Sequence, residues 1–209
     1  MGIAERRQRE KESRIRQIRD SAAAVFFEKG FEAATMEDIA ARAEISKAAI
    51  YLYFKSKEDL YYGLVEPALE RLSRRLVRIA GHGNLDPVRK IKKMVDATFD
   101  FYDRDPDAYH LVSRYKAAEF SKLLSREKLD RLKGLMRSNL YQVEKAISEG
   151  ILSGRFRRVD PRITSIIVWN AFMGVIQFQE NRMQKGKSDY RRPTIEAAIE
   201  LILRGLKKR

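Results

Sequence analysis

The sequence predicts an all-α protein, and three observations lead to that prediction. Apolar residues recur every three or four positions in one stretch after another, which is the spacing of an amphipathic helix. No stretch shows the sustained alternation of a half-buried strand, and the Asn-Gly signal of a tight hairpin is absent. Capping and turn residues fall between the periodic stretches. About nine helices are expected, with breaks near Gly30, Glu44-Ile45, Lys55, residues 81–84, Asp105-Pro106, Ser125, Gly154 and residues 185–189.

Three short helices are expected first, over about residues 13–29, 36–43 and 46–53. Thr35 followed by Asp38 resembles a capping box, and Ser46 is a suitable N-cap for the third helix. The connection between the second and third helices is only two or three residues long, which favours a helix-turn-helix over an antiparallel hairpin. Its small core would consist of Ile39, Ala40, Ala43, Ile45 and Ile50, with Phe26, Phe31 and Phe54 around it.

The longer helices follow in order along the chain. Apolar stripes run from Leu60 to Leu76 within a helix expected over 57–80, then from Ile91 to Tyr102 and from Leu129 to Ile147. The last two helices are expected over about 160–184 and 191–207. The predicted domains are residues 1–55, which hold the helix-turn-helix, and residues 56–209, a second helical domain.

The composition excludes several classes of protein. The chain of 209 residues has no cysteine and only two histidines, so we expect no disulfide framework, cysteine nucleophile, metal or cofactor. Its charged N-terminus lacks the apolar core of a signal peptide. The most apolar run, residues 163–178, is shorter than the ~20 residues of a membrane span and contains Asn170 and Gln177. A soluble, cytoplasmic protein is expected.

The net charge of +14 is by itself weak evidence for DNA binding. Residues 1–60 hold 12 Lys/Arg and 11 Asp/Glu, whereas residues 61–209 hold 31 and 18. Salt screens interactions beyond about 10 Å, so only cations close to a phosphate strengthen binding. Most of the excess positive charge therefore lies outside the helix-turn-helix.

The third short helix has the features of a DNA reader. In a helix-turn-helix, the second helix of the pair lies in the major groove. If Ile50 and Phe54 face inward, Lys47, Ala48 and Tyr51 face the solvent or the groove. Alanines permit close approach to bases, lysine reaches a guanine edge or a phosphate, and tyrosine hydroxyls donate to phosphate. The predicted DNA-binding residues are Thr35, Ser46, Lys47, Ala48, Ala49, Tyr51, Leu52, Tyr53 and Lys57, the last as a phosphate ligand at a helix N-terminus.

The segment GFEAATMEDIAARAEISKAAIYLYFKSKEDL resembles the DNA-binding part of the TetR family of bacterial transcriptional regulators. The resemblance covers about residues 13–65 and implies an N-terminal reader, an all-α C-terminal part that binds ligand and dimerises, and no enzymatic activity. Where the family usually has Gly between the reader helices this chain has Glu44, which costs about 1–2 kcal/mol if that residue is left-handed. Ala48-Ala49 replace the usual Gly-Thr, so one hydroxyl contact to DNA is missing. The residues at motif spacing are Phe26, Gly30, Thr35, Ile39, Ala40, Ala43, Ser46, Ile50, Tyr51, Phe54, Lys57 and Leu60.

Plainer interpretations of these residues stay open. A tyrosine on a short helix often packs under a neighbouring domain, as Tyr53 could at the domain junction, and Lys55 fits a solvated surface charge. The basic leader has seven Lys/Arg between Arg6 and Arg19. It is either a solvated helix end or an arm that reaches the adjacent minor groove.

The C-terminal part is expected to supply dimerisation and a ligand pocket. One reader buries too little DNA for useful specificity, so we expect a homodimer on a palindromic double-stranded DNA operator. The last two helices are the candidate dimer face, because residues 163–178 are apolar around most of the helix circumference. The aromatic residues of the middle region are either core or the lining of a cavity. The predicted ligand contacts are Phe99, Tyr102, Tyr109, His110, Tyr115, Trp169, Asn170, Phe172 and Gln177, with His110, Asn170 and Gln177 as the polar groups.

The sequence thus predicts a ligand-responsive transcriptional repressor that a hydrophobic effector releases from DNA. Basic clusters such as Arg89-Lys90 and Lys92-Lys93 are either solvated helix faces or contacts to an anionic effector such as a fatty acyl-CoA. The helix over residues 57–80 would transmit effector binding to the reader. One rival is an enzyme that uses the aromatic cavity, for which no nucleophile elbow, phosphate loop or metal cluster is visible in the sequence. The other rival is a nonspecific DNA binder.

Overall fold

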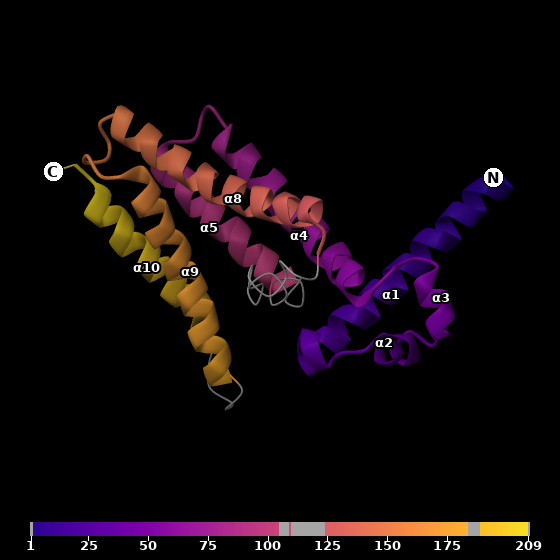
Figure 1. The fold of residues 1–209 in the computed structure, drawn as a ribbon. Coiled ribbons are helices and arrows are strands. Elements are labelled where there is room, and N and C mark those ends of the chain that lie inside the picture. Colours follow the sequence, from indigo (N-terminus) through magenta and orange to yellow (C-terminus); the bar gives the residue numbers. More distant parts are fainter. Residues whose placement is uncertain (1, 105–108, 110–123, 184–188, 209) are drawn as a thin grey trace. The chain divides into compact units, whose positions relative to one another are not determined.

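The computed structural model describes residues 2–104, 109, 124–183 and 189–208, and every regular element in these ranges is an α-helix (Figure 1). This confirms the all-α prediction. The stretch between the predicted breaks at Asp105-Pro106 and Ser125 falls almost entirely outside the described residues. The described helices are α1 (Ile3–Ala33), α2 (Met36–Arg42), α3 (Lys47–Tyr51), α4 (Lys57–Ala80), α5 (Pro87–Arg104), α8 (Arg126–Leu152), α9 (Pro161–Met183) and α10 (Arg191–Leu206).

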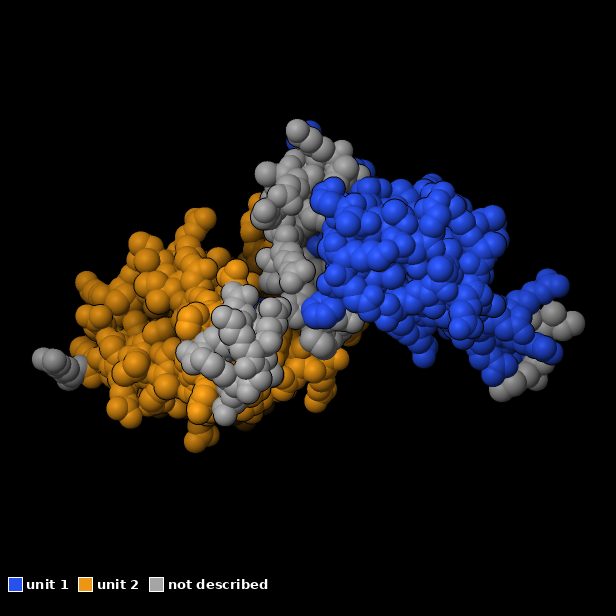
Figure 2. Space-filling model, turned by 90° about the horizontal axis from the view of Figure 1, so that it is seen from below, with its two compact units in different colours: residues 1–69, 105–132 blue, residues 70–104, 133–209 orange. Residues whose placement is uncertain are grey.

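The chain forms two compact units (Figure 2). Unit 1 comprises residues 1–69 and 105–132, and unit 2 comprises residues 70–104 and 133–209. Two long helices, α4 and α8, therefore each contribute residues to both units. The predicted domain boundary at residues 55 and 56 stays a prediction, and the compact units divide the chain later, within α4.

In unit 1, α1 begins at Ile3, ten residues earlier than expected from apolar periodicity. Its first turns have no apolar stripe, but charged and polar pairs such as Arg6–Glu10 support them on the helix surface. The predicted break at Gly30 is confirmed, since this residue has φ 76° and ψ 163° inside the helical span. Glycine suits this position because a positive φ carries little penalty without a Cβ atom. The chain therefore turns toward α2 at the predicted residue.

The caps of α2 and α3 are those that the sequence predicts. The Thr35 hydroxyl accepts from the Asp38 amide (3.1 Å), and the Asp38 carboxylate accepts from the Thr35 amide (3.0 Å). The Ser46 hydroxyl likewise accepts from the Ala49 amide (3.1 Å). Between the helices Glu44 has φ 53°, so a residue with a Cβ atom does occupy the left-handed position. Short-range hydrogen bonds thus fix the orientation of both helices of the helix-turn-helix.

The core of unit 1 forms around the inner faces of α1 to α4. Ile18, Phe26, Ile39 and Ile50 are buried there, with Leu60 from α4 beside them. The Gln17 side-chain amide donates to the Ala43 carbonyl (2.8 Å), which ties the middle of α1 to the end of α2. A fixed inner face on α3 leaves its outer face toward solvent, and that face is the candidate DNA-binding surface.

Unit 2 is a helical bundle in which α9 packs along α10 (Figure 1). The buried Lys90 ammonium donates to the Ala80 carbonyl at the end of α4 (2.9 Å) and to the Glu149 carboxylate on α8 (2.7 Å). After α8, the buried Phe156 ring lies against Gly150, where a Cβ atom would stand 2.0 Å from the ring. A side chain at residue 150 would displace Phe156. These contacts hold the ends of α4, α5 and α8 together.

None of the described helices is long and apolar enough to cross a membrane. In the same described ranges, no group of three or more His, Asp or Glu residues is placed to hold a metal ion.

Candidate DNA-binding surface and ligand cavity

The outer face of α3 presents the residues expected to read DNA. Ile50 is 0% exposed, whereas Lys47, Ala48 and Leu52 are exposed and the Tyr51 side chain is 46% exposed. Because Ile50 is buried in the core, α3 cannot rotate about its axis, and the same residues always face the solvent. Among the other predicted contacts, Thr35 and Ser46 are exposed, and Tyr53 and Ala49 are half-buried. The structure thus brings these predicted residues together at α3 and the cap of α2.

Lys47 forms an ion pair with Glu37 of α2, and its ammonium lies 5.9 Å from the centre of the Tyr51 ring. The hydrogen bond to Glu37 raises the pKa of Lys47, and the same bond lowers the pKa of Glu37. Both groups are therefore charged at neutral pH. A phosphate or a guanine edge that binds Lys47 would have to share it with Glu37 or displace that carboxylate.

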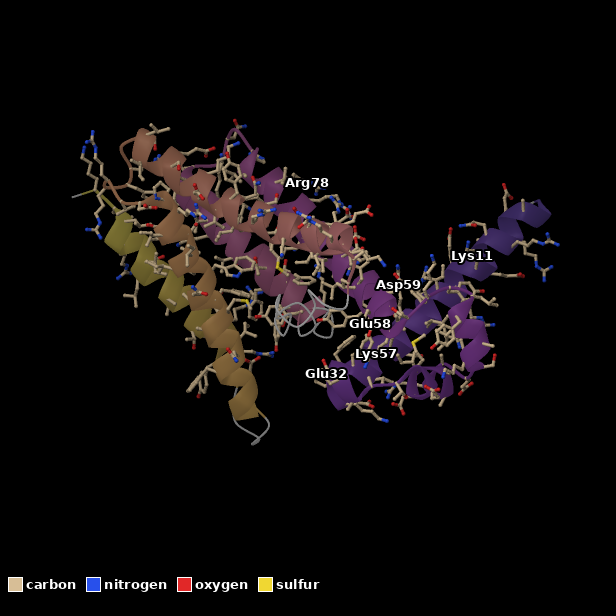
Figure 3. All side chains as sticks on the ribbon, in the orientation of Figure 1. Lys11, Glu32, Lys57, Glu58, Asp59 and Arg78 are labelled. Atoms are coloured by element: carbon tan, nitrogen blue, oxygen red, sulfur yellow. The ribbon has the colours of Figure 1, made fainter. Side chains whose placement is uncertain are left out.

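Lys57 serves a structural purpose that the sequence did not indicate (Figure 3). Its ammonium donates to the carbonyls of Phe31 (2.7 Å), Glu32 (3.1 Å) and Ala34 (3.0 Å), at the end of α1. The same nitrogen lies 4.5 Å from the centre of the Phe31 ring. An ammonium has three donors, and three carbonyls take them here. The phosphate contact predicted for Lys57 stays a prediction, and it competes with this role as a cap.

Three cations of α1 form a stripe, which we call the arm stripe: Arg7, Lys11 and Arg14. Their spacing continues backward from the buried Ile18 and Ala22, so they lie on the face of α1 that carries these two buried residues. All three are exposed, and Figure 1 shows the first turns of α1 continuing beyond α2 and α3. Within the described residues, no ion pair involves Arg7 or Lys11, and Arg14 donates to Gln17 (2.9 Å). The basic N-terminal segment is thus helical, and the arm stripe occupies one face of that helix.

Unit 2 contains a small cavity of about 10 Å³ between α5, α8 and α9, which is room for about one water molecule. The Thr98 hydroxyl in its wall donates to the Met94 carbonyl (2.8 Å), so the wall offers an apolar surface. Ligand pockets for drug-sized molecules have about 300–1,000 Å³, so a guest of that size would require side chains to move. The lining residues are Met94, Val95, Thr98, Val143, Val168, Trp169 and Phe172.

The predicted ligand contacts divide into several groups. Trp169 and Phe172 line the cavity, and their contact with a ligand stays a prediction. Phe99 and Tyr102 are buried as a ring pair with centres 6.0 Å apart, and the Arg192 guanidinium covers Phe99 at 4.4 Å. They belong to the core beside the cavity. Tyr109 is buried but belongs to unit 1, and His110 and Tyr115 lie outside the described residues.

Asn170 and Gln177 were expected to orient a ligand, and the structure does not place them in the cavity. Both are exposed on the side of α9 that also carries the exposed Ile163 and Ile167. Val168 and Phe172 are buried on the opposite side. The helix is apolar around most of its circumference, so its sequence could not show which side faces inward.

Sequence reasoning missed a different polar residue, Asn139 on α8. It is 1% exposed and lies among buried apolar residues, including Leu135 and Val143. Its one sequence signal is a polar residue within an apolar stripe. In the basic pair Arg89-Lys90, Lys90 is not on a solvated helix face, because it is buried in an ion pair with Glu149.

An open groove between α5 and α10 is larger than the cavity but chemically different. Lys92, Asp96, Glu196 and Glu200 line much of it. Lys92 is paired with Glu200 (2.8 Å), which also accepts from Arg204 (3.3 Å). An exposed groove lined by ion pairs suits water better than an apolar guest.

Family models match both parts of the chain. Residues 18–62 match the model described as bacterial regulatory proteins, tetR family. Residues 87–200 match the model described as the tetracyclin repressor-like C-terminal domain. The second match covers more than half of the 209 residues.

Individual relatives agree with the family models. The HTH-type transcriptional activator FasR of Mycolicibacterium smegmatis is 33% identical over 102 residues, which cover 49% of this chain and 46% of FasR. The match thus spans less than half of that relative. The solved structure of PfmR, a TetR family regulator from Thermus thermophilus, has a TM-score of 0.75 at 26% identity and covers 91% of this chain and 99% of PfmR. FadR from Bacillus subtilis, solved with stearoyl-CoA, has a TM-score of 0.69 at 21% identity over 91% of this chain and 98% of FadR, and shows a shared fold.

Proposed function

The chain belongs to the tetR family of bacterial regulatory proteins and is a DNA-binding transcriptional regulator rather than an enzyme, and we propose that it acts in the cytoplasm as a ligand-responsive repressor. The observation that carries the proposal is the fixed outer face of α3. Ile50 anchors this helix in the core while Lys47, Ala48 and Tyr51 stay accessible to a major groove. DNA contacts by these residues are supported by their exposure and by the helix-turn-helix that holds them.

The arm stripe extends this interface along α1. Arg7, Lys11 and Arg14 continue the face of α1 that carries the buried Ile18 and Ala22, and α1 packs on α2 of the helix-turn-helix. We infer that the arm stripe reaches DNA beside the reader. Cations spaced over about 10 Å of a helix can contact successive backbone phosphates. Such contacts add affinity without adding sequence preference.

A homodimer is supported by an exposed apolar face on the last two helices. Ile163, Ile166 and Ile167 are exposed on one side of α9, and Leu201 is exposed on α10, which packs beside it. Contiguous apolar side chains at the surface of a helix pair mark an interaction site. A second copy of the same pair would cover them in a four-helix bundle, and a two-fold dimer suits a palindromic operator.

The effector is proposed to enter the cavity lined by Trp169 and Phe172. Since α4 contributes residues to both compact units, a change in unit 2 can pass along this helix to the reader. Pro67 lies inside α4 and cannot donate the backbone hydrogen bond to the carbonyl four residues earlier. This weak point lies close to the residue where unit 1 ends. We propose that α4 bends at Pro67 to different degrees. An effector that binds more tightly to one degree of bending changes the fraction of the protein that can bind DNA.

Fatty acyl-CoA is the first effector to test. FadR of Bacillus subtilis, which shares the fold, was solved with stearoyl-CoA. The apolar lining of the cavity suits an acyl chain.

The test uses the full chain and duplex DNA from its own promoter region. Fluorescence anisotropy of labelled DNA should show higher affinity for the promoter duplex than for a random duplex of equal length. Stearoyl-CoA should release the promoter duplex from the protein. Trp169 is the single tryptophan of the chain and lines the cavity, so its fluorescence reports occupancy directly. Promoter binding that stearoyl-CoA leaves unchanged, despite a Trp169 response, would contradict release by this effector.

A separate experiment tests whether the protein represses or activates transcription. The relative FasR is an activator, whereas release from an occluded promoter describes a repressor. Transcription in vitro from the bound promoter, with and without the protein, decides between them. Lower transcript in the presence of protein is expected.

A further inference from the structure

Asn139 on α8 is a buried polar residue that the proposed function leaves without a role. Its side chain is 1% exposed. Within the described residues, neither the amide nitrogen nor the amide oxygen has a hydrogen-bond partner. Buried polar side chains are almost always paired, because burying one without a partner destabilises the fold. An orphaned amide in a well-packed bundle therefore needs an explanation.

The position of Asn139 relates it to the cavity. It precedes Val143 by one helical turn, about 6 Å along the axis, so both side chains lie on the same face of α8. Val143 lines the cavity. The buried neighbours on this face include Leu132, Leu135 and Ala146, all apolar. The amide thus interrupts an apolar face beside the space into which the effector is proposed to bind.

The other buried polar groups of these helices already have partners. On α8, the Gln142 amide donates to the Ser138 carbonyl (3.3 Å). On α5, the Thr98 hydroxyl donates to Met94, and Lys90 is paired with Glu149. On α9, the Thr164 and Ser165 hydroxyls donate to backbone carbonyls (2.7 and 2.8 Å). Among the described buried side chains of α5, α8 and α9, Asn139 keeps its full bonding capacity for a guest.

We propose that Asn139 is a ligand contact, and that the part of the effector that enters the cavity is an apolar chain with one neutral group that carries both a carbonyl and an N–H. This inference rests on the proposed function of the cavity and adds the chemistry of its occupant. A primary amide offers two donors and one acceptor oxygen, so a carboxamide-type group satisfies both of its sides. None of the described residues that line the cavity is charged, so a carboxylate there would lose its hydration without gaining a counter-ion. The neutral group fixes the orientation of the ligand, and the apolar part fills the space beside Trp169.

The first test needs no ligand. Protein freed of bound small molecules is unfolded by heat as the parent chain and as Asn139→Leu, Asn139→Ala and Asn84→Leu, the last being an exposed control. If the amide is orphaned without a guest, both substitutions at residue 139 leave the unfolding midpoint unchanged or raise it by several degrees. The smaller alanine variant guards against overpacking by leucine. A lower midpoint in both variants means that the amide has a structural partner or an ordered water only, and overturns the inference.

The second test measures recognition through Trp169 fluorescence. Octanamide and octane are the probes, because they share an apolar chain and differ in the carboxamide. The ratio of their dissociation constants is compared between the parent, Asn139→Leu, Asn139→Ala and Asn84→Leu. We expect the preference for octanamide to fall at least tenfold in both variants at residue 139 and to persist in the control.

The outcomes separate this inference from the function on which it rests. An unchanged preference in the Asn139 variants, or a parent protein that binds no octanamide, overturns the role of Asn139. Release of promoter DNA by stearoyl-CoA would survive either result. Conversely, a protein that prefers octanamide through Asn139 but never binds its promoter would contradict the regulatory function alone.

Discussion

The reader in unit 1 and the cavity in unit 2 are built from contacts of different range along the chain. At the reader, Ser46 caps an amide three residues away, and Thr35 exchanges hydrogen bonds with Asp38. In unit 2, Lys90 meets Glu149 across 59 residues and Lys92 meets Glu200 across 108. Local bonds form as soon as the segment is helical, whereas distant pairs require the whole bundle. The reader is therefore determined by its own segment, and the cavity is determined by packing.

The same contrast separates what each region does with its polar groups. The reader presents its polar residues outward and fixes them by caps and by one anchored isoleucine, Ile50. Beside the cavity, the buried amide of Asn139 has no hydrogen-bond partner among the described residues. A surface of fixed shape suits recognition of a regular duplex. A buried amide without a hydrogen-bond partner suits a site whose conformation changes when a ligand binds.

The largest expected effect comes from breaking the apolar face of α9. Ile167→Arg places a charge where 51% of an isoleucine is exposed, and the dimer should dissociate. Promoter affinity should fall by about a thousandfold, toward nonspecific binding. Analytical ultracentrifugation and DNA anisotropy measure both effects. Val77→Arg on α4, where the side chain is 48% exposed, is the matched control and should stay dimeric. Equal dissociation in both variants would argue against this face.

The next largest effect tests whether unit 1 extends its DNA contact along α1. Arg7→Gln, Lys11→Gln and Arg14→Gln together should lower the slope of log affinity against log salt by about 2.7 per protomer. A random duplex suffices as the probe, because phosphate contacts carry no sequence preference. The control removes the same charge from other faces of α1, through Arg6→Gln, Arg9→Gln and Arg16→Gln. Equal changes in both triple variants would mean that net charge alone matters.

A third prediction separates the two roles of Lys57. Lys57→Ala should lower the free energy of unfolding of DNA-free protein by about 1–3 kcal/mol, because the carbonyls at the end of α1 lose a charged donor. Lys55→Ala, two residues earlier and exposed, should change it by less than about 0.5 kcal/mol. Chemical denaturation measures both. If Lys57→Ala weakens DNA binding without any loss of stability, its main role is the phosphate contact.

A fourth prediction concerns the outer face of α3. Tyr51→Phe removes one hydroxyl and should weaken promoter binding about tenfold per protomer, the effect of a hydrogen bond to a charged phosphate. Stability should be unchanged, since Tyr51 is 46% exposed. Tyr141→Phe on α8, where Tyr141 is 56% exposed, serves as the control. DNA anisotropy that shows no difference between the two variants would remove Tyr51 from the interface.

The smallest effect is expected from the capping box of α2. Hydrogen bonds from Lys29 and Thr35 lower the pKa of Asp38 below its ordinary value. The stability that this carboxylate adds is present above its unfolded pKa of about 3.9 and is lost as the pH falls through the lower folded value. The thermal midpoints of the parent and Asp38→Asn should therefore differ at pH 7 and converge toward pH 3. A constant difference would show that the charge of Asp38 does not stabilise the cap.

Particular residues show how far the sequence could go. The break at Gly30, the caps at Thr35 and Ser46, and the inward direction of Ile50 all follow from residues within one or two turns. The left-handed conformation of Glu44 was suggested by the family resemblance, because the family usually has Gly at this position. The role of Lys57 was not identifiable, since its three carbonyl partners lie 23 to 26 residues earlier in the chain.

The sequence by itself determined the helices, their caps and the family to which the reader belongs, because these depend on spacing and on neighbours along one helix. Only the tertiary structure decided which side of α9 faces inward, and so removed Asn170 and Gln177 from the cavity. It alone showed that Asn139 is buried and has no hydrogen-bond partner in the described part of the chain. When a helix is apolar around most of its circumference, its sequence does not show which side faces inward. That side is decided when other helices pack against it.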